Sequence, residues 1–319
     1  MARAFIFPGQ GSQAVGMGKA LAEAFPAAKL VFEEVDEALK QKLSRLMFDG
    51  PEADLTLTEN AQPALMTVSQ AVLKVLESEG GWKLADKVQF VAGHSLGEYS
   101  ALAAAGSLHL ADAARLLRLR GLAMQKAVPV GVGAMAALLG LDLPQAQEVA
   151  AAAARESGKI CGTANDNAPG QIVVSGDKDA VDLAVKLAAE KGAKRSIILP
   201  VSAPFHCALM QPAADAMADA LAATKIAMPV VPLIANVTAQ PVSDPDTIRK
   251  LLVEQVTATV RWRESVQTMK ARNVHQVFEL GAGKVLAGLI KRIDKEIEAS
   301  SVGSPADIEA ALKALSSVQ

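Results

Sequence analysis

Apolar residues recur along this chain with two different periods. Short apolar runs, typical of buried strands, lie at residues 2–7, 89–93, 134–140, 159–164, 171–175, 194–200, 230–235 and 276–280. Apolar residues at helical spacing occupy residues 17–25, 58–79, 100–105, 111–128, 143–156 and 179–191, and two segments that end near residues 255 and 272. Strands that alternate with helices predict an α/β protein with a central parallel sheet.

One internal segment has an element order of its own. Residues 131–201 are predicted to run strand, helix, strand, strand, helix, strand. This βαββαβ order is the ferredoxin-like, split βαβ arrangement. We therefore expect an inserted ferredoxin-like subdomain at residues 131–201 and a discontinuous core formed by residues 1–130 and 202–319. The polar run at residues 165–170 predicts a loop between the two middle strands of the insert.

The stretch Gly93-His94-Ser95-Leu96-Gly97 stands between a predicted strand and a predicted helix. Gly-x-Ser-x-Gly in this context is typical of a nucleophile elbow, in which a sharp turn exposes the serine hydroxyl and the glycines let neighbouring backbone pass closely. The start of the following helix points N–H groups at the group under attack, which supplies part of an oxyanion hole. The pattern predicts an α/β-hydrolase-like core with Ser95 as the nucleophile.

A serine hydroxyl is a weak nucleophile and needs a general base. Among the four histidines, His206 is the candidate because it follows Ser95 in the chain, in a loop that leads into a helix. His94 is expected to point away from Ser95 and to serve packing or hydrogen bonding. The turn around Gln10, after the first strand, is expected to form a second wall of the site and to offer a backbone N–H to the oxyanion.

Composition excludes several classes of function. The chain has 319 residues, 51% of them hydrophobic, and a net charge of −2 from 32 basic and 34 acidic side chains, so no global field draws it to nucleic acid or to a membrane surface. The two cysteines, Cys161 and Cys207, form no CxxC pair, which argues against a zinc site and suits a reducing compartment. With no secretory signal and no apolar span in the sequence, we expect a cytoplasmic monomer without a metal.

Several short motifs occur in register from residue 4 to about residue 293. They are Gly9-Gln10-Gly11-Ser12-Gln13, the elbow through Glu98-Tyr99, Arg120-Gly121 with Met124-Gln125, Gly133-Ala134-Met135-Ala136-Ala137, Asn165-x-Asn167-x-Pro169-Gly170-Gln171, Ser202-x-Pro204-x-His206 and Gly283-Lys284-Val285-Leu286. Together they resemble the malonyl-CoA:acyl carrier protein transacylases. No single motif has to carry the resemblance.

The resemblance implies a ping-pong acyl transfer. Ser95 would attack the thioester of malonyl-CoA with His206 as base, CoA would leave, and the phosphopantetheine thiol of acyl carrier protein would take the malonyl group from the serine. A main-chain carbonyl at the position of Gln255 would orient the histidine, and the backbone N–H groups of Gln10 and Leu96 would hold the oxyanion. Malonyl-CoA is then a substrate, and no cofactor is expected.

Substrate selection is also implied by the resemblance. Two of the arginines Arg115, Arg118 and Arg120 are expected to be solvated, and the resemblance selects Arg120 as the one that grips the malonyl carboxylate. A buried guanidinium left unpaired by a neutral acyl group is costly, so such groups should be rejected. Other positions that match the family's substrate path are Met124, Asn165, Asn167 and Phe205.

Three further features of the sequence qualify the resemblance. Thr259 stands where the family usually has a proline before Val-x-Trp. The bulky Phe205 before the histidine resembles malonyl-selective domains, and we hypothesise that its ring excludes an α-methyl group. Because acyl carrier proteins are acidic, a basic docking patch is expected near the cleft mouth, with Lys284, Lys291 and Arg292 as candidates.

Two other interpretations stay open at this stage. A serine thioesterase or esterase would use the same serine, histidine and oxyanion hole with water as the acceptor, although it has no need of a buried cation. A non-catalytic carrier-binding module could keep the fold for assembly alone. The sequence does not separate fatty acid synthesis from polyketide synthesis or malonate decarboxylation.

Overall fold

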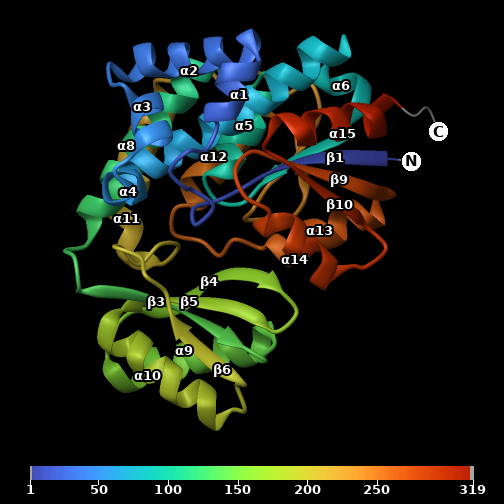
Figure 1. The fold of residues 1–319 in the computed structure, drawn as a ribbon. Coiled ribbons are helices and arrows are strands. Elements are labelled where there is room, and N and C mark those ends of the chain that lie inside the picture. The colour runs from blue at the N-terminus through green and yellow to red at the C-terminus, as the bar shows by residue number, and fades with distance from the viewer. Residues whose placement is uncertain (1, 317–319) are drawn as a thin grey trace.

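The computed structural model describes residues 2–316, and their strands form two separate sheets (Figure 1). The larger sheet has the order β10 (Glu298–Val302), β9 (Val274–Leu280), β1 (Ala2–Phe7), β2 (Phe90–Gly93), β7 (Leu233–Ile234) and β8 (Pro241–Val242). Its pairs are parallel except for the last, β7 with β8. The smaller sheet is antiparallel, with the order β4 (Cys161–Ala168), β5 (Gln171–Asp177), β3 (Gly133–Leu139) and β6 (Arg195–Ile198). The predicted α/β class with a parallel-rich sheet is confirmed.

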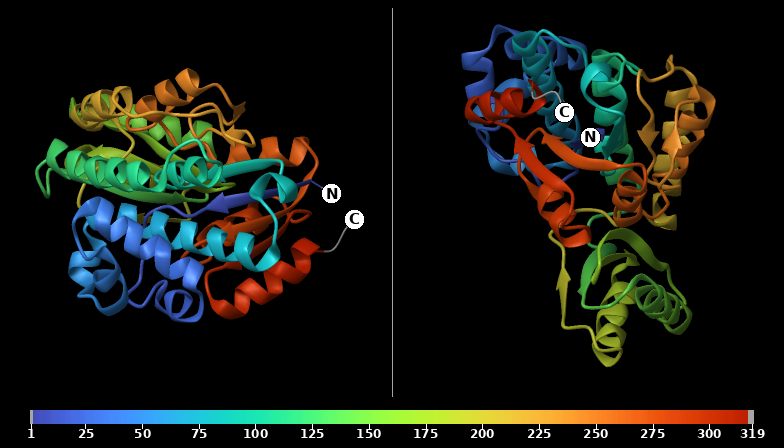
Figure 2. Two further views of the ribbon diagram at one scale, coloured as in Figure 1. Left: turned by 90° about the horizontal axis from the view of Figure 1, so that it is seen from above. Right: turned by 90° about the vertical axis from the view of Figure 1, so that its right-hand side faces the viewer.

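Both faces of the larger sheet are buried, which explains its apolar strands. Phe5 and Phe7 on β1 point into a core cluster shared with helices on one face, whereas the alternate residues Ala4 and Ile6 join a second cluster on the other face. The helices whose residues build the first cluster include α1 (Lys19–Ala24), α2 (Pro26–Leu39), α3 (Leu43–Asp49), α5 (Thr58–Gly80), α8 (Leu110–Ala127), α11 (Gln211–Ala222), α12 (Pro245–Glu254) and α15 (Pro305–Ser316). The second is covered by α13 (Trp262–Ala271) and α14 (Val285–Ile293), as Figure 2 shows.

Residues 133–198 form a four-stranded unit that lies below the larger sheet in Figure 1. Helices α9 (Leu143–Ser157) and α10 (Lys178–Glu190) complete its βαββαβ order and pack on one face of its sheet around a core of their own. The segment lies within the range predicted for the insert. The domain limits at residues 130 and 202 stay a prediction.

The prediction of a loop at residues 165–170 is wrong. β4 continues to Ala168, and only Pro169 and Gly170 turn the chain. The strand extends because its backbone groups find partners on both sides: β5 on one edge, and Val260 on the other, where the N–H of Asp166 donates to the Val260 carbonyl at 2.9 Å. Asp166 is fully buried and pairs with Arg263 of α13 at 2.7 Å, so this strand joins the four-stranded unit to the core.

The remaining elements are short. They are α4 (Glu52–Thr56), α6 (Leu84–Lys87), α7 (Gly97–Ala104) and the 3₁₀ turn η1 (Ala208–Met210). None of the helices within residues 2–316 combines the length and the apolar character needed to cross a bilayer.

Candidate active site

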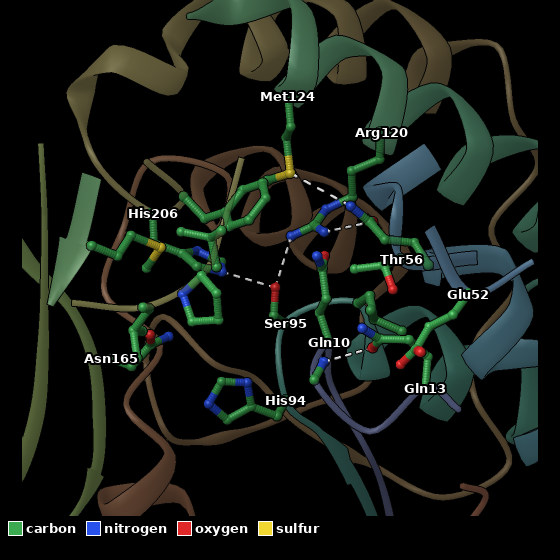
Figure 3. Close-up of a pocket in the computed structure, with 18 residues that line it drawn as sticks. Gln10, Gln13, Glu52, Thr56, His94, Ser95, Arg120, Met124, Asn165 and His206 are labelled. Carbon is green, nitrogen blue, oxygen red and sulfur yellow. Dashed lines mark hydrogen bonds between the residues drawn. The ribbon is translucent and has the colours of Figure 1, made fainter. Parts of the chain in front are cut away.

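Ser95 occupies a sharp turn between β2 and α7, and its backbone is left-handed (φ 54°). The turn requires glycine on both sides. A Cβ on Gly93 would lie 1.9 Å from the carbonyl oxygen of Gly97, and a Cβ on Gly97 would lie 2.3 Å from the carbonyl oxygen of Phe7. This close passage of backbone holds the serine in a strained conformation that directs its hydroxyl into a cavity (Figure 3).

His206 lies next to the serine, in the segment between β6 and η1, and it too has a left-handed backbone (φ 57°). Its Nε2 is 2.8 Å from Ser95 Oγ, and its Nδ1 is 2.9 Å from the main-chain oxygen of Gln255. A carbonyl oxygen can only accept, so Nδ1 carries the proton and Nε2 is left to accept from the serine hydroxyl. This is the tautomer that a general base requires.

Burial keeps His206 neutral. The ring is 4% exposed, and its desolvation, with the positive charge of Arg120 as the next cause, lowers the pKa of His206 to about 3. The imidazole is therefore unprotonated at neutral pH and available to take a proton.

Arg120 projects from α8 to the other side of the serine and is 1% exposed. Its Nη2 donates to Ser95 Oγ at 3.1 Å and to Gln255 Oε1 at 2.7 Å, and its Nη1 donates to Gln62 Oε1 at 2.8 Å. The Tyr99 ring lies 5.7 Å from the guanidinium carbon. The Nε–H is buried without a hydrogen bond of good geometry to residues 2–316, and all three acceptors are neutral. Arg120 is thus a buried cation with donor capacity for an anion.

The other two arginines of α8 do not reach this cavity. Arg115 is exposed and pairs with Asp112, and Arg118 is half-buried, with Nη1 donating to Asn60. Arg115 is solvated as expected, whereas Arg118 is only partly exposed because its guanidinium is hydrogen-bonded to Asn60.

A buried polar network braces the turn from behind. Asn236 accepts from the Ser95 backbone N–H at 2.8 Å and donates to the Gly93 carbonyl at 2.7 Å. The amide nitrogen of Gln255 donates to the Ser95 carbonyl at 2.9 Å and to Glu98, which also accepts from the Asn236 backbone at 3.1 Å. Burial raises the pKa of Glu98 to about 7.

The cavity in front of Ser95 has a volume of about 530 Å³, and Figure 3 draws the 18 residues that line it. The predicted site residues among them are Gln10, Ser95, Leu96, Arg120, Met124, Asn165, Phe205 and His206. Met135, Leu199 and Val201 also line it, so the four-stranded unit and the segment that follows it form one wall. Apolar side chains of this wall face polar groups that converge on Ser95, and such a combination is typical of a substrate site.

Two predicted residues lie behind this lining. Gln255 acts through its hydrogen bonds to His206, Arg120 and the serine backbone. Asn167 holds His94: its Oδ1 accepts from His94 Nε2 at 2.8 Å. His94 makes the hydrogen bond expected of it, but its ring also lines the cavity.

Comparison with known proteins decides the family. Residues 4–304 match the model of the acyl transferase domain. The chain belongs to the acyl transferase family. It is 48% identical over 312 residues to a malonyl CoA-acyl carrier protein transacylase of Bacillus subtilis strain 168, which covers 98% of this chain and 96% of the relative.

Solved structures support the same assignment for this acyltransferase. An acyl-carrier-protein-S-malonyltransferase of Bartonella henselae matches with a TM-score of 0.96 and 58% identity, over 99% of this chain and 100% of that one. A malonyl-transacylase solved in complex with its type II PKS acyl-carrier protein matches with a TM-score of 0.94 and 41% identity, over 98% and 100% of the two chains. The predicted resemblance and enzyme class are confirmed.

Sequence reasoning missed three buried residues of the acyltransferase site: Asn236, Gln62 and Thr58. Asn236 follows the carboxyl end of β7, which neighbours β2 in the parallel sheet, and a polar residue at that edge is a signal that could have identified it. Gln62 and Thr58 lie one turn apart on α5, and their sequence context is that of any helix N-terminus. Only the tertiary structure brings them to Arg120.

The threonine that replaces the family's proline leaves the site geometry intact. The Thr259 hydroxyl donates to the Thr163 carbonyl at 2.6 Å, and the Gln255 carbonyl still lies 2.9 Å from His206 Nδ1. Of the basic docking candidates, Lys284 lines a second cavity, and Arg292 hydrogen bonds to Gln171 of the four-stranded unit.

Proposed function

We propose that this acyltransferase moves the malonyl group from malonyl-CoA to the phosphopantetheine thiol of acyl carrier protein, through a malonyl-Ser95 intermediate, and so supplies fatty acid elongation. The observation that carries the proposal is the buried cation beside the nucleophile: Arg120 Nη2 lies 3.1 Å from Ser95 Oγ, and its hydrogen-bond acceptors are neutral. A carboxylate-bearing acyl group fits that arrangement, and a neutral one does not.

In the first half-reaction Ser95 Oγ attacks the thioester carbonyl as its proton passes to His206 Nε2. The Gln255 carbonyl, which accepts from Nδ1, stabilises the imidazolium that forms. The backbone N–H groups of Gln10 and Leu96 are proposed to hold the oxyanion. When the intermediate collapses, the carbon–sulfur bond breaks, His206 returns the proton to the CoA sulfur, and the acyl-serine remains.

The second half-reaction is the same chemistry run in reverse with a different thiol. The phosphopantetheine thiol gives its proton to His206 and attacks the malonyl-serine ester. The proton then returns to Ser95 Oγ as the ester bond breaks, and the free serine is regenerated. Neither half-reaction consumes a cofactor.

Arg120 links the acyl group to the base. Its positive charge is one cause of the low pKa of His206, so a bound malonyl carboxylate, by offsetting that charge, makes His206 a stronger base. A neutral acyl group does not offset the charge of Arg120, so the pKa of His206 stays low. The proposed role of Phe205, which is 9% exposed and lines the cavity, is to exclude an α-methyl group; methylmalonyl transfer by Phe205→Ser that does not exceed that of the parent would contradict it.

Acyl carrier protein is the proposed acceptor, as in the relative whose complex with such a protein has been solved. Met124 and Asn165 are proposed to border the acyl and pantetheine path, with Asn167 supporting that path through His94. Lys284, Lys291 and Arg292 are proposed to contact the carrier. A monomeric, cytoplasmic protein belongs to the same proposal. Sedimentation of the free protein tests its monomeric state.

The deciding experiment incubates the protein with malonyl-CoA, with and without the holo carrier protein, and follows the products by mass spectrometry. Transfer predicts malonyl carrier protein, and a malonyl-serine adduct on Ser95 when the carrier is absent. Free malonate as the main product would instead identify a thioesterase. Ser95→Ala should form neither product, and transfer by that variant at the parent rate would contradict a malonyl-Ser95 intermediate. A parent protein that forms neither product would leave the non-catalytic carrier-binding module as the interpretation of this fold.

A further inference from the structure

A chain of hydrogen bonds connects the two ends of the cavity. Arg120 Nη1 donates to Gln62 Oε1 at 2.8 Å, Gln62 Nε2 donates to Thr58 Oγ1 at 3.0 Å, and the Thr58 hydroxyl donates to Gln10 Oε1 at 2.8 Å. The guanidinium can only donate, and the threonine hydroxyl has a single proton, so the bonds all run from Arg120 toward Gln10. Bonds aligned in this way polarise one another.

The middle of this chain is buried and rigid. Thr58 and Gln62 are each 1% exposed and lie four residues apart at the start of α5, which places them on the same face of the helix. Gln62 is also held by Met124, whose sulfur accepts from Nε2 at 3.7 Å. Buried polar groups of this kind are costly unless they are paired, so each link depends on the next.

The far end of the chain is a loop. Gln10 is exposed and precedes Gly11, whose φ of 103° breaks the regular backbone after β1. The bond from Thr58 ties the Gln10 side chain to α5. The Gln10 backbone is the proposed oxyanion donor. The hydrogen-bond chain therefore connects Arg120, where the acyl carboxylate would bind, to the wall that would hold the thioester oxygen.

We propose that Thr58 and Gln62 are positioning residues that couple Arg120 to the Gln10 wall. A carboxylate bound to Arg120 fixes the guanidinium, and the hydrogen bonds through Gln62 and Thr58 then fix the Gln10 side chain as well. A malonyl group therefore acylates Ser95 faster than a neutral acyl group does. This inference rests on the proposed function. Neither Thr58 nor Gln62 touches Ser95 or His206 in the hydrogen bonds described above.

The test replaces Thr58 with the isosteric Val and measures acylation of Ser95 by malonyl-CoA and by acetyl-CoA in the absence of carrier protein. Mass spectrometry of the intact protein over time gives both rates. The ratio of malonyl to acetyl acylation should fall about tenfold, because acetyl-CoA makes no use of Arg120. The half-saturating concentration of malonyl-CoA should change much less than the maximal rate of acylation, and Thr58→Ser, which keeps the hydroxyl, should restore the ratio.

Thr67→Val is the matched control. Thr67 is also a 1% exposed threonine of α5, but its hydroxyl donates to the Pro63 carbonyl within the helix. A ratio that stays at the parent value in Thr58→Val, or that falls equally in Thr67→Val, would overturn the inference. An inactive parent protein would instead defeat the proposed function.

A second variant keeps the test decisive if Thr58→Val fails to fold. Gln10→Ala removes the acceptor at the exposed end of the chain and keeps the backbone N–H. It should lower the malonyl-to-acetyl ratio to a similar extent. Where both variants fold, the double variant should be no worse than either one, since the two substitutions break the same link; a ratio unchanged in Gln10→Ala would overturn the coupling.

Discussion

The two halves of the catalytic pair share a strained backbone but are held in different ways. Ser95 and His206 have φ values of 54° and 57°, both in the left-handed region that side chains disfavour. The serine is enclosed by backbone, with Gly93 and Gly97 in contact behind it and Asn236 clamping the turn. The histidine lies in a segment without regular secondary structure and is held through its ring.

This difference separates strain that is fixed by neighbours in sequence from strain that is fixed by the tertiary fold. At Ser95 the glycines two positions away on either side make the turn possible, so the Gly-x-Ser-x-Gly motif predicts it from the sequence. At His206 the orienting bond comes from the carbonyl of Gln255, far away in sequence. The serine half should therefore respond to substitution as part of the core, and the histidine half mainly as part of the chemistry.

The largest effect is expected from Gly93→Ala. The added Cβ would lie 1.9 Å from the Gly97 carbonyl oxygen, which is backbone and cannot move aside, so the elbow and the sheet beside it should not form. Soluble yield and thermal unfolding measure this loss. Gly162→Ala, on strand β4 with open space around the new Cβ, is the control and should unfold at the parent temperature. A folded Gly93→Ala protein with parental stability would remove the distinction between the two halves.

A smaller effect, confined to activity, is expected from His206→Ala. Loss of the general base should slow malonyl transfer by about 10²- to 10⁴-fold, while the melting temperature stays close to that of the parent. Steady-state kinetics and calorimetry measure the two quantities. His109→Ala, at an exposed histidine that precedes α8, should change neither of them. Unfolding of His206→Ala to the extent expected of the glycine variant would contradict the comparison.

The smallest effect is a shift along the pH axis. Burial lowers the pKa of His206 to about 3, so the ring stays neutral and can act as a base at pH values well below 6. The rate at which phenylmethanesulfonyl fluoride inactivates Ser95 should therefore be the same at those pH values as at neutral pH. An acid limb near pH 6.5 would contradict this. Unfolded histidine has a pKa of 6.5, so the unfolded chain binds the extra proton; His206 therefore contributes stability above pH 6.5 that is lost as the pH falls toward 3.

The parts of the molecule that follow a local rule could be predicted from the sequence. The elbow is specified by steric rules that act within five residues, and the alternation of apolar runs gave the α/β class. The sequence predicts a shorter β4 because Asn165 and Asp166 are residue types that favour turns, whereas pairing with the distant Val260 keeps them extended. Partners far apart in sequence leave no local signal.

The site shows the same division. Ser95 and His206 were found by motif and order, and the choice of Arg120 among the three helix arginines needed a family resemblance, because burial depends on packing. Asn236 and Thr58 were missed since their roles consist of hydrogen bonds to distant elements. Local chemistry identifies the reacting groups, but the fold decides what holds them.

Strands β3 and β6, where the four-stranded unit begins and ends, lie side by side, with Ala136 paired to Ile198. Both crossings between the unit and the core are therefore close together, which is the layout of a hinge. Polar contacts from β4 act as a latch: His94 with Asn167, and Asp166 with Val260 and with Arg263. Swinging the unit outward would break these contacts together with the bonds from Thr259 to Thr163, from Val260 to Ala164 and from Arg292 to Gln171. At roughly 1 kcal/mol for each hydrogen bond, they disfavour the open form by several kcal/mol.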